Sequence, residues 1–268
     1  MDEWIGRSRT QEDEITRPAL QRIAALLDIA SPDFPTGSPI PPHWYAMFFP
    51  DIAPQSQLGR DGHPTRGDFL PPIALPRRMF AGRRVRFFAP LRVGDIATKR
   101  SEIVSITPKT GRTGAMVFVT IRHSISASGG DVLVEEQDVV YREAAAPNAP
   151  APTPTPPPAE PAWSETVTPT TTMLFRYSSI TWNTHRIHYD ADYVRAEEGY
   201  PDLVMNGGLT ALLLIEAATR CHGRPPVGLD IRNVSPLFVN QPVTLAGNGT
   251  AIWAANQAGG LAVLATFF

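Results

Sequence analysis

Apolar and polar residues alternate in several segments, with the period of half-buried β-strands. In the first half of the chain the expected strands are residues 83–88, 96–107, 115–125 and 132–141. In the second half they are residues 228–234, 243–253 and 261–268. This pattern contains no second-half counterpart of the strand at 132–141. We therefore expect an open sheet edge there, which makes a homodimer possible.

One segment has a different pattern. Residues 209–221 are good helix formers and are apolar on nearly every face, with Glu216 as the main exception. A surface helix would have a single apolar stripe, so this helix is expected to be buried against an antiparallel sheet. The first half offers only weaker candidates for an equivalent helix, the amphipathic residues 18–29 and the aromatic residues 43–49.

The two halves of the chain are similar to each other. A single offset aligns residues 85–93 with 231–239, and also residues 114–120 with 260–266. Such a repeat predicts a tandem duplication whose halves pack about a pseudo-twofold axis. Between them lies a proline-rich stretch, residues 144–161, which is typical of an extended linker. We therefore expect an N-terminal unit at 1–143 and a C-terminal unit at 162–268.

Composition narrows the possible functions. With 24 Lys and Arg against 26 Asp and Glu, the net charge of −2 favours neither nucleic acid nor an anionic membrane as a partner. The first residues resemble no targeting signal, and the longest apolar run is too short to span a bilayer. The single cysteine, Cys221, excludes a disulfide framework and is interpreted as structural. We expect a soluble, cytoplasmic protein.

The densest polar stretch contains Asn183-Thr-His-Arg-Ile-His188, and Val204-Met-Asn-Gly-Gly-Leu209 follows it. With residues 41–49 and 67–80, these motifs resemble those of MaoC-type (R)-specific enoyl-thioester hydratases and dehydratases. The branch that acts on mesaconyl-CoA and itaconyl-CoA is the most similar. The resemblance implies an α+β double hotdog fold, in which each antiparallel sheet wraps around a buried helix. It also implies a hydro-lyase whose substrate is carried on coenzyme A or on the phosphopantetheine of an acyl-carrier protein.

Hydration of an unsaturated thioester requires proton transfer and stabilisation of an oxyanion. His188 is the residue of the motif whose pKa suits both proton transfers. Asn183 occupies the position where the resemblance places the aspartate of many relatives, so we expect it to orient the water. His188 then acts largely alone, or Asp190 helps it. The backbone N–H groups of Gly207 and Gly208, at the start of the buried helix, are expected to form the oxyanion hole.

Several residues are expected to bind the substrate. Arginines suit the phosphates of coenzyme A or an acyl carboxylate. The run at 77–86 supplies Arg77 and Arg78 as the main candidates, with Arg83, Arg84 and Arg86 behind them. The motifs themselves supply the remaining candidates: Arg176, Arg186, Tyr189 and Asn206.

Other interpretations remain open at this point. His185, His188, Asp190 and Asp192 could form a metal site, or the two histidines could be solvated loop residues. The chain could also be a hotdog thioesterase, or an acyl-thioester-binding subunit without activity because Asn183 and Asn206 cannot transfer protons. The resemblance implies neither a metal nor a redox cofactor.

Overall fold

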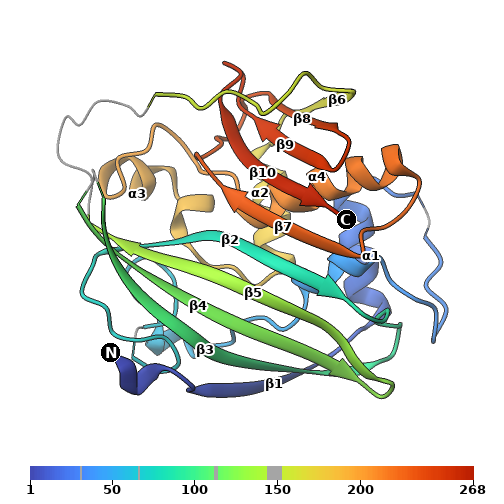
Figure 1. Ribbon diagram of the computed structural model, residues 1–268, viewed down its shortest axis with the longest axis horizontal. Helices are drawn as coiled ribbons and strands as arrows, with labels where there is room; N and C mark the ends of the chain where they lie inside the picture. The colour runs from blue at the N-terminus through green and yellow to red at the C-terminus, as the bar shows by residue number, and fades with distance from the viewer. Residues whose placement is uncertain (31, 66, 112–113, 144–152) are drawn as a thin grey trace.

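The computed structural model of the chain describes residues 1–30, 32–65, 67–111, 114–143 and 153–268. Its strands are β1 (Ser8–Glu14), β2 (Arg77–Phe87), β3 (Ile96–Gly111), β4 (Gly114–Ala127), β5 (Gly130–Arg142), β6 (Trp163–Val167), β7 (Gly228–Asn233), β8 (Val243–Asn248), β9 (Ala251–Ala255) and β10 (Leu261–Phe267). All are antiparallel and belong to one sheet, in the order β1-β3-β4-β5-β2-β7-β10-β9-β8-β6 (Figure 1). Each half of the chain thus supplies one half of a continuous sheet.

The two half-sheets join at β2 and β7. Their register pairs Arg83 with Ile231 and Val85 with Leu229. The offset that aligns 85–93 with 231–239 matches Arg83 with Leu229 and Val85 with Ile231. Each of the two pairs therefore corresponds to the other, as expected for a pseudo-twofold axis that runs through the junction. Gly82 permits the close approach, because a Cβ there would overlap the Ile231 carbonyl oxygen. The repeated segment is therefore the strand pair at the centre of the molecule.

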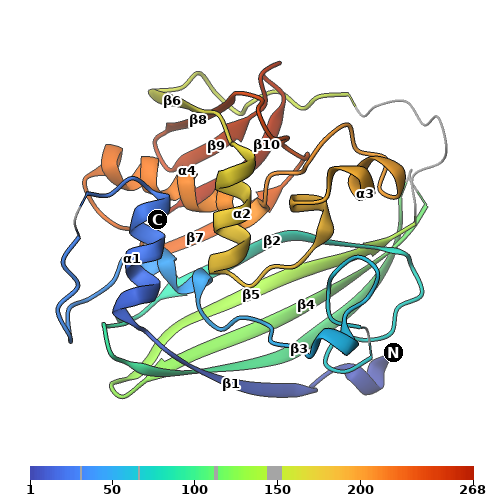
Figure 2. The ribbon, with the colours of Figure 1, turned by 180° about the vertical axis from the view of Figure 1, so that it is seen from behind.

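The longer helices are α1 (Arg17–Leu26), α2 (Thr171–Ile180) and α4 (Gly207–His222), with the shorter α3 (Ala191–Ala196) between the last two. Within the described residues there are also four 3-10 helices: η1 (Asp2–Trp4), η2 (Pro42–Met47), η3 (Gln55–Gln57) and η4 (Arg186–His188). The buried α4 packs on β8, β9 and β10, as its all-round apolar sequence predicts. α1 and α2 lie side by side on the same side of the sheet (Figure 2). None of the helices within the described residues is long and apolar enough to cross a membrane.

In the first half, the aromatic segment η2 packs against α4. Trp44 Nε1 donates to Glu216 Oε1 at 2.7 Å, and His43 Nε2 lies 2.8 Å from the same oxygen. The one charged residue in the middle of α4 is therefore satisfied by the first half. The expectation that residues 43–49 replace a helix agrees with this packing.

Two expectations about the second half are wrong. Residues 243–253 are not one strand but the β8–β9 hairpin, which turns at Gly249 with φ 56°. Asn248 ends β8 and pairs with Ala251, so Gly249 and Thr250 form a two-residue loop, and a glycine in such a loop is a hairpin signal. With β8 and β9 as separate strands, β10 lies beside β7 as β5 lies beside β2, so β10 is the equivalent of β5. The counterpart of 132–141 is therefore present. The sequence match of 114–120, in β4, with 260–266, in β10, does not correspond to equivalent strands.

The outer strands β1 and β6 were not expected from the sequence. Their residues are polar and largely exposed, which hides the alternation. Each is followed by a helix with a threonine N-cap: Thr16 accepts from the Ala19 N–H, and Thr170 from the Met173 N–H. This strand-cap-helix unit therefore occurs once in each half.

The proline-rich stretch lies partly outside the described residues, at 144–152. Residues 153–161 form no helix or strand, and the Leu261 N–H donates to the Thr155 carbonyl at 2.7 Å. The expected division into units 1–143 and 162–268 remains a prediction. Cys221, near the end of α4, is exposed and is a free thiol.

Replacing Gly82 by alanine is expected to lower the free energy of unfolding by roughly 1–3 kcal/mol, because the added methyl group meets backbone in a buried strand pair. Gly129 in the β4–β5 turn is the matched control, since a Cβ there meets nothing within 4 Å. Urea unfolding of both variants measures the difference. Equal stability of Gly82→Ala and Gly129→Ala would contradict the close β2–β7 contact.

Candidate active site

His188 ends η4, in the segment between α2 and α3. The segment is closed by local hydrogen bonds: the Asn183 N–H donates to the Ser178 carbonyl at 2.8 Å, and Asn183 Oδ1 accepts the His185 N–H at 3.0 Å. This is the side-chain-to-backbone bond typical of asparagine in turns. Since the side-chain oxygen is used, the NH₂ group of Asn183 is the part left to meet a water or a substrate.

The ring of His188 is held in one tautomer. Nδ1 lies 2.7 Å from the Val204 carbonyl oxygen, and a carbonyl only accepts, so Nδ1 carries the proton. Nε2 is then the basic nitrogen, and it has no hydrogen-bond partner within the described part of the chain. His188 is 7% exposed, and burial lowers its pKa to about 4. His188 is therefore a neutral, oriented base at pH 7.

The start of α4 presents free backbone donors. Gly207 and Gly208 are its first two residues, and their N–H groups precede the first intrahelical bond. Asn206 is the N-cap, but its side chain makes no capping bond. A Cβ on Gly208 would overlap the Tyr177 hydroxyl, whereas the space around Gly207 is larger. Donors and helix dipole together suit a developing negative charge.

Two polar side chains beside this helix start are buried and incompletely paired. The Tyr177 hydroxyl has no hydrogen-bond partner among the described residues, and burial raises the pKa of Tyr177 to about 12, so the group remains a donor. Asn206 is 2% exposed; its Nδ2 donates to Ser178 Oγ at 3.2 Å, while Oδ1 is unpaired. Unpaired buried polar atoms are uncommon and point to a polar ligand here. The sequence analysis singled out Asn206 but missed Tyr177, whose position on α2 shows no distinctive pattern.

A loop of the first half, residues 59–65, is fastened to the His188 segment. The Arg186 N–H donates to the Asp61 carbonyl at 2.9 Å, and Thr184 Oγ1 donates to the Gly62 carbonyl at 2.6 Å. Gly62 has φ 87°, and a Cβ on it would overlap the Thr184 carbonyl oxygen. Glycine is therefore required at position 62, where the loop of the first half contacts the His188 segment of the second half.

This loop brings a further histidine to the site. His63 Nδ1 lies 3.1 Å from Asp61 Oδ2, and the His63 ring lies against that of His185 with centroids 4.0 Å apart. The His185 ring in turn lies edge-on to His188, at 5.5 Å. Burial lowers the pKa of His63 and takes that of His185 to about 2. Sequence reasoning assigned no role to His63, because its proximity to the motif is a long-range contact without a local pattern.

The residues that could bind a metal differ from those considered in the sequence analysis. Donor atoms of Asp61, His63 and His185 lie within 4.8 Å of one another and could face a cation. The contacts between them are a hydrogen bond from His63 to Asp61 and a tilted ring contact between His63 and His185, and these need no ion. We interpret the group as an oriented pair of histidines beside His188.

Three expected site residues, Asp190, Arg186 and Tyr189, form hydrogen bonds with residues of their own segment. Asp190 Oδ1 accepts the Tyr193 N–H at the start of α3, and Asp190 Oδ2 accepts from Arg186 at 2.7 Å. The Tyr189 hydroxyl donates to the Thr184 carbonyl at 3.0 Å. These bonds favour structural roles for Asp190, Arg186 and Tyr189, and the structure records no bond from Asp190 to His188 in the described residues.

The other expected arginines differ in position. Arg176 is exposed on α2. Arg77 donates to the Glu198 carbonyl at 2.8 Å. Arg78 is half-buried and close enough for its charge to lower the pKa of His185, after burial and the neighbouring histidines. Of these, Arg78 is the one that the structure brings nearest to the histidine cluster.

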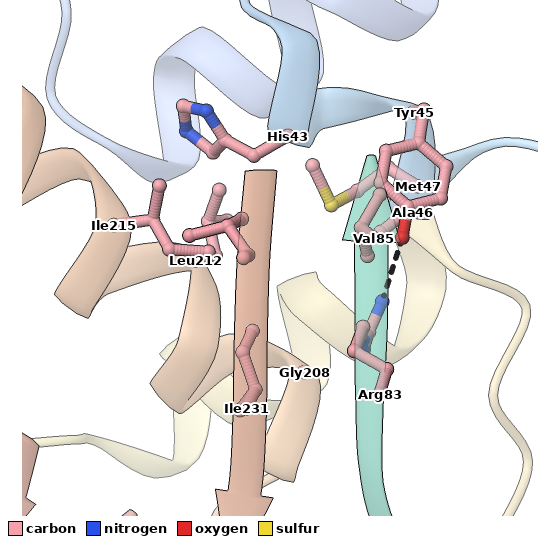
Figure 3. A pocket seen from close by; sticks show the side chains of 11 residues that line it. His43, Tyr45, Ala46, Met47, Arg83, Val85, Gly208, Leu212, Ile215 and Ile231 are labelled. Carbon is pink, nitrogen blue, oxygen red and sulfur yellow. Dashed lines mark hydrogen bonds between the residues drawn. The ribbon is translucent and has the colours of Figure 1, made fainter. Parts of the chain in front are cut away.

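A small cavity connects the helix start with the first half. It lies between α4, η2 and the β2–β7 junction and has a free volume of about 20 Å³ (Figure 3). Gly208 lines it from α4, and Arg83 lines it from β2. Its remaining walls are mostly apolar, including Met47, Leu212 and Ile231. The described residues thus include a buried neutral base at His188, free helix N–H groups at Gly207 and Gly208 and a small recess that Gly208 lines. A base and free N–H donors are the groups needed by the class of enzyme that moves a proton and stabilises an oxyanion.

Comparison with known proteins agrees with this class. The model of the family described as hydroxyacyl-thioester dehydratase type 2 matches residues 43–239. A protein of Chloroflexus aurantiacus named mesaconyl-C(4)-CoA hydratase is 46% identical over 90% of this chain and 86% of its own length. The chain belongs to this family of MaoC-like hydratases and dehydratases, and it is an enzyme of the hydro-lyase type. The family predicted from the sequence is confirmed.

Solved structures confirm the fold. A MaoC-like dehydratase from Phytophthora capsici superimposes with a TM-score of 0.69 at 14% identity, covering 98% of this chain and 95% of that one. A Mycobacterium tuberculosis protein described as a double hotdog gives a TM-score of 0.59 at 12% identity, covering 98% and 95%. The expected α+β double hotdog architecture is therefore correct.

The depressed pKa of His188 predicts a loss of stability in mild acid. Below pH 6.5 the histidine of the unfolded chain takes up a proton, while the folded one stays neutral until about pH 4. Stability therefore falls as the pH is lowered through this window. Between pH 7 and pH 5, His188 should account for about 2 kcal/mol of the loss.

Urea unfolding of the wild type and of His188→Gln at both pH values tests this expectation. The variant should lose less stability between pH 7 and pH 5, while the other buried histidines continue to contribute in both proteins. The same pH dependence in both would show that His188 is not held neutral by burial.

Proposed function

We propose that the enzyme catalyses the reversible addition of water to a short 2-enoyl-CoA, forming a 3-hydroxyacyl-CoA. The observation that carries this proposal is the buried His188, whose Nδ1 is bound to Val204 and whose basic Nε2 is free. Such a base suits removal of a proton from water at neutral pH. The free N–H groups of Gly207 and Gly208 suit the oxyanion that the same step produces.

In the proposed hydration, His188 Nε2 accepts a proton as the water oxygen bonds to C3. The electron pair of the double bond moves toward the thioester, and the Gly207 and Gly208 N–H groups stabilise the negative charge on its oxygen. The imidazolium of His188 then returns a proton to C2. Dehydration follows the same steps in reverse.

Asn183 has a limited role in this scheme. Its amide cannot exchange a proton as a carboxyl group does, so His188 performs both proton transfers. The NH₂ group can donate to the attacking water, because Asn183 Oδ1 is occupied by the His185 N–H. The Tyr177 hydroxyl is a further donor beside Gly208 and would add to the oxyanion hole.

The carrier and the length of the acyl group rest on the same relative. The relative at 46% identity is named for a coenzyme A thioester, which supports coenzyme A as the carrier. The same name gives a short acyl group, which supports a short acyl chain here. The cavity at Gly208, about 20 Å³, has room for about one water and does not bear on the acyl length.

Replacing His188 by alanine is expected to lower kcat by about 1,000-fold or more, since no other group takes both proton transfers. Purified protein would be incubated with crotonyl-, mesaconyl- and longer enoyl-CoA thioesters, and the gain of one water would be followed by mass spectrometry. His222→Ala, at the other end of α4, serves as the matched control and should retain activity. Undiminished hydration by His188→Ala would exclude the proposed base.

The pH dependence should follow the folded pKa of His188. Because the base must be unprotonated, kcat/KM is expected to stay level from pH 8 to about 5.5 and to fall toward pH 4. Activity should return when samples held at low pH are brought back to pH 7, which separates titration from unfolding. A fall centred near 6.5 would mean that the base is a solvated histidine.

A further inference from the structure

Asn206 stands at the N-cap of α4 but does not cap the helix. Asparagine is among the residues that most often close a helix start, where its side-chain oxygen accepts an N–H group of the first turn. The Asn206 side chain makes no such bond to α4. Its Nδ2 donates instead to Ser178 Oγ on α2, at 3.2 Å. The side chain is therefore held by a neighbouring helix, and the N–H groups of Gly207 and Gly208 stay free.

The oxygen of the same amide is left without a partner. Asn206 is 2% exposed, and its Oδ1 is a buried acceptor to which no group in the described part of the chain donates. An unmade hydrogen bond at a buried acceptor is unfavourable, so this site is complete only with a donor from outside the protein. A thioester oxygen cannot serve, because it is itself an acceptor. The missing partner of Oδ1 is an O–H or N–H group.

Short connections link Asn206 to the two residues assigned to the attacking water. Two residues before it, the Val204 carbonyl accepts from His188 Nδ1 at 2.7 Å. Ser178, whose hydroxyl holds the Asn206 amide, also accepts the Asn183 N–H through its carbonyl, at 2.8 Å. The segment that carries Asn183 and His188 is thus tied on both sides to the residues around the start of α4.

We propose that Asn206 Oδ1 accepts a hydrogen bond from the attacking water and, after the addition, from the 3-hydroxyl group of the product. This inference rests on the proposed function, which supplies that water. One of its two O–H groups gives its proton to His188 Nε2, and a proton from His188 then reaches C2. The other O–H stays on the oxygen as the 3-hydroxyl and needs an acceptor. Asn183 Oδ1 already accepts the His185 N–H, whereas Asn206 Oδ1 is free.

With this contact, all four directions around the water oxygen are assigned. The water donates to His188 and Asn206, it accepts from the NH₂ group of Asn183, and its remaining lone pair faces C3. A nucleophile that is oriented before the reaction lowers the entropic part of the barrier. Asn206 is thus a further catalytic residue, since it touches the oxygen that reacts.

Asn206→Leu removes the acceptor and keeps the approximate size of the side chain. For crotonyl-CoA, kcat is expected to fall by about 10- to 100-fold with less than about 3-fold change in KM, because the water loses its orientation while the thioester still binds. Thr210→Val is the matched control, since this buried hydroxyl donates to the Asn206 backbone carbonyl at 3.2 Å. Its kcat should stay within about 3-fold of the wild type. A wild-type kcat in folded Asn206→Leu would overturn the proposal.

If Asn206→Leu does not fold, Asn206→Ala replaces it. The smaller side chain leaves room for a second water that can accept in place of Oδ1, so the expected fall in kcat is smaller, about 5-fold or more. An unchanged kcat in Asn206→Ala would then count against the proposal in the same way.

Binding without turnover gives a second readout. In His188→Ala, the better-bound epimer of 3-hydroxybutyryl-CoA should bind about 3-fold or more tightly than butyryl-CoA, which lacks only the hydroxyl group. Adding Asn206→Leu should remove this preference, because the hydroxyl then meets an apolar side chain. Calorimetry measures both affinities. Equal weakening of the two thioesters by Asn206→Leu would show that Asn206 only shapes the helix start, and would refute the hydroxyl contact.

The two measurements separate failure of this inference from failure of the proposed function. If the wild type hydrates no thioester, but the hydroxyl preference appears and depends on Asn206, the acceptor site stands and the hydration proposal fails. If hydration occurs and depends on His188, but the hydroxyl preference is absent or survives in Asn206→Leu, the proposed function stands and the role of Asn206 is refuted.

Discussion

The antiparallel pairing of β2 with β7 is the contact on which the rest of the structure depends. It joins two half-sheets into one and relates them by a pseudo-twofold axis. It also brings η2 and Arg83 of the first half to the start of α4, where an equivalent half would have placed a second long helix. The two halves thus contribute differently: the second supplies α4 and the histidine motif, and the first supplies η2, Arg83 and the loop with His63.

The chemistry depends on how burial acts on histidine. The Val204 carbonyl fixes the proton of His188 on Nδ1, and desolvation keeps the ring neutral at physiological pH. With Asn183 unable to exchange a proton, a single base serves both directions of the reaction we propose. The cost of this burial is a stability that declines in mild acid. The same loss of solvent strengthens the helix N–H groups as partners for negative charge.

Local patterns in the sequence predicted much of the fold. The all-round apolar residues 209–221 indicated the buried helix, and the two motifs indicated the family. The errors had physical causes. Residues 243–253 were predicted as one strand although they turn at Gly249, and the exposed strands β1 and β6 were missed because their sequences lack clear alternation. The loop bearing His63 reaches the motif only through long-range bonds, such as Arg186 N–H to the Asp61 carbonyl, which no local pattern encodes.

The most direct test of this account is a crystal structure of the enzyme with a short saturated acyl-CoA that cannot be hydrated, such as butyryl-CoA. The account predicts that the thioester oxygen accepts from the Gly207 and Gly208 N–H groups and that C3 faces His188 Nε2. A thioester bound away from the start of α4, or with C3 beyond the reach of His188, would contradict it.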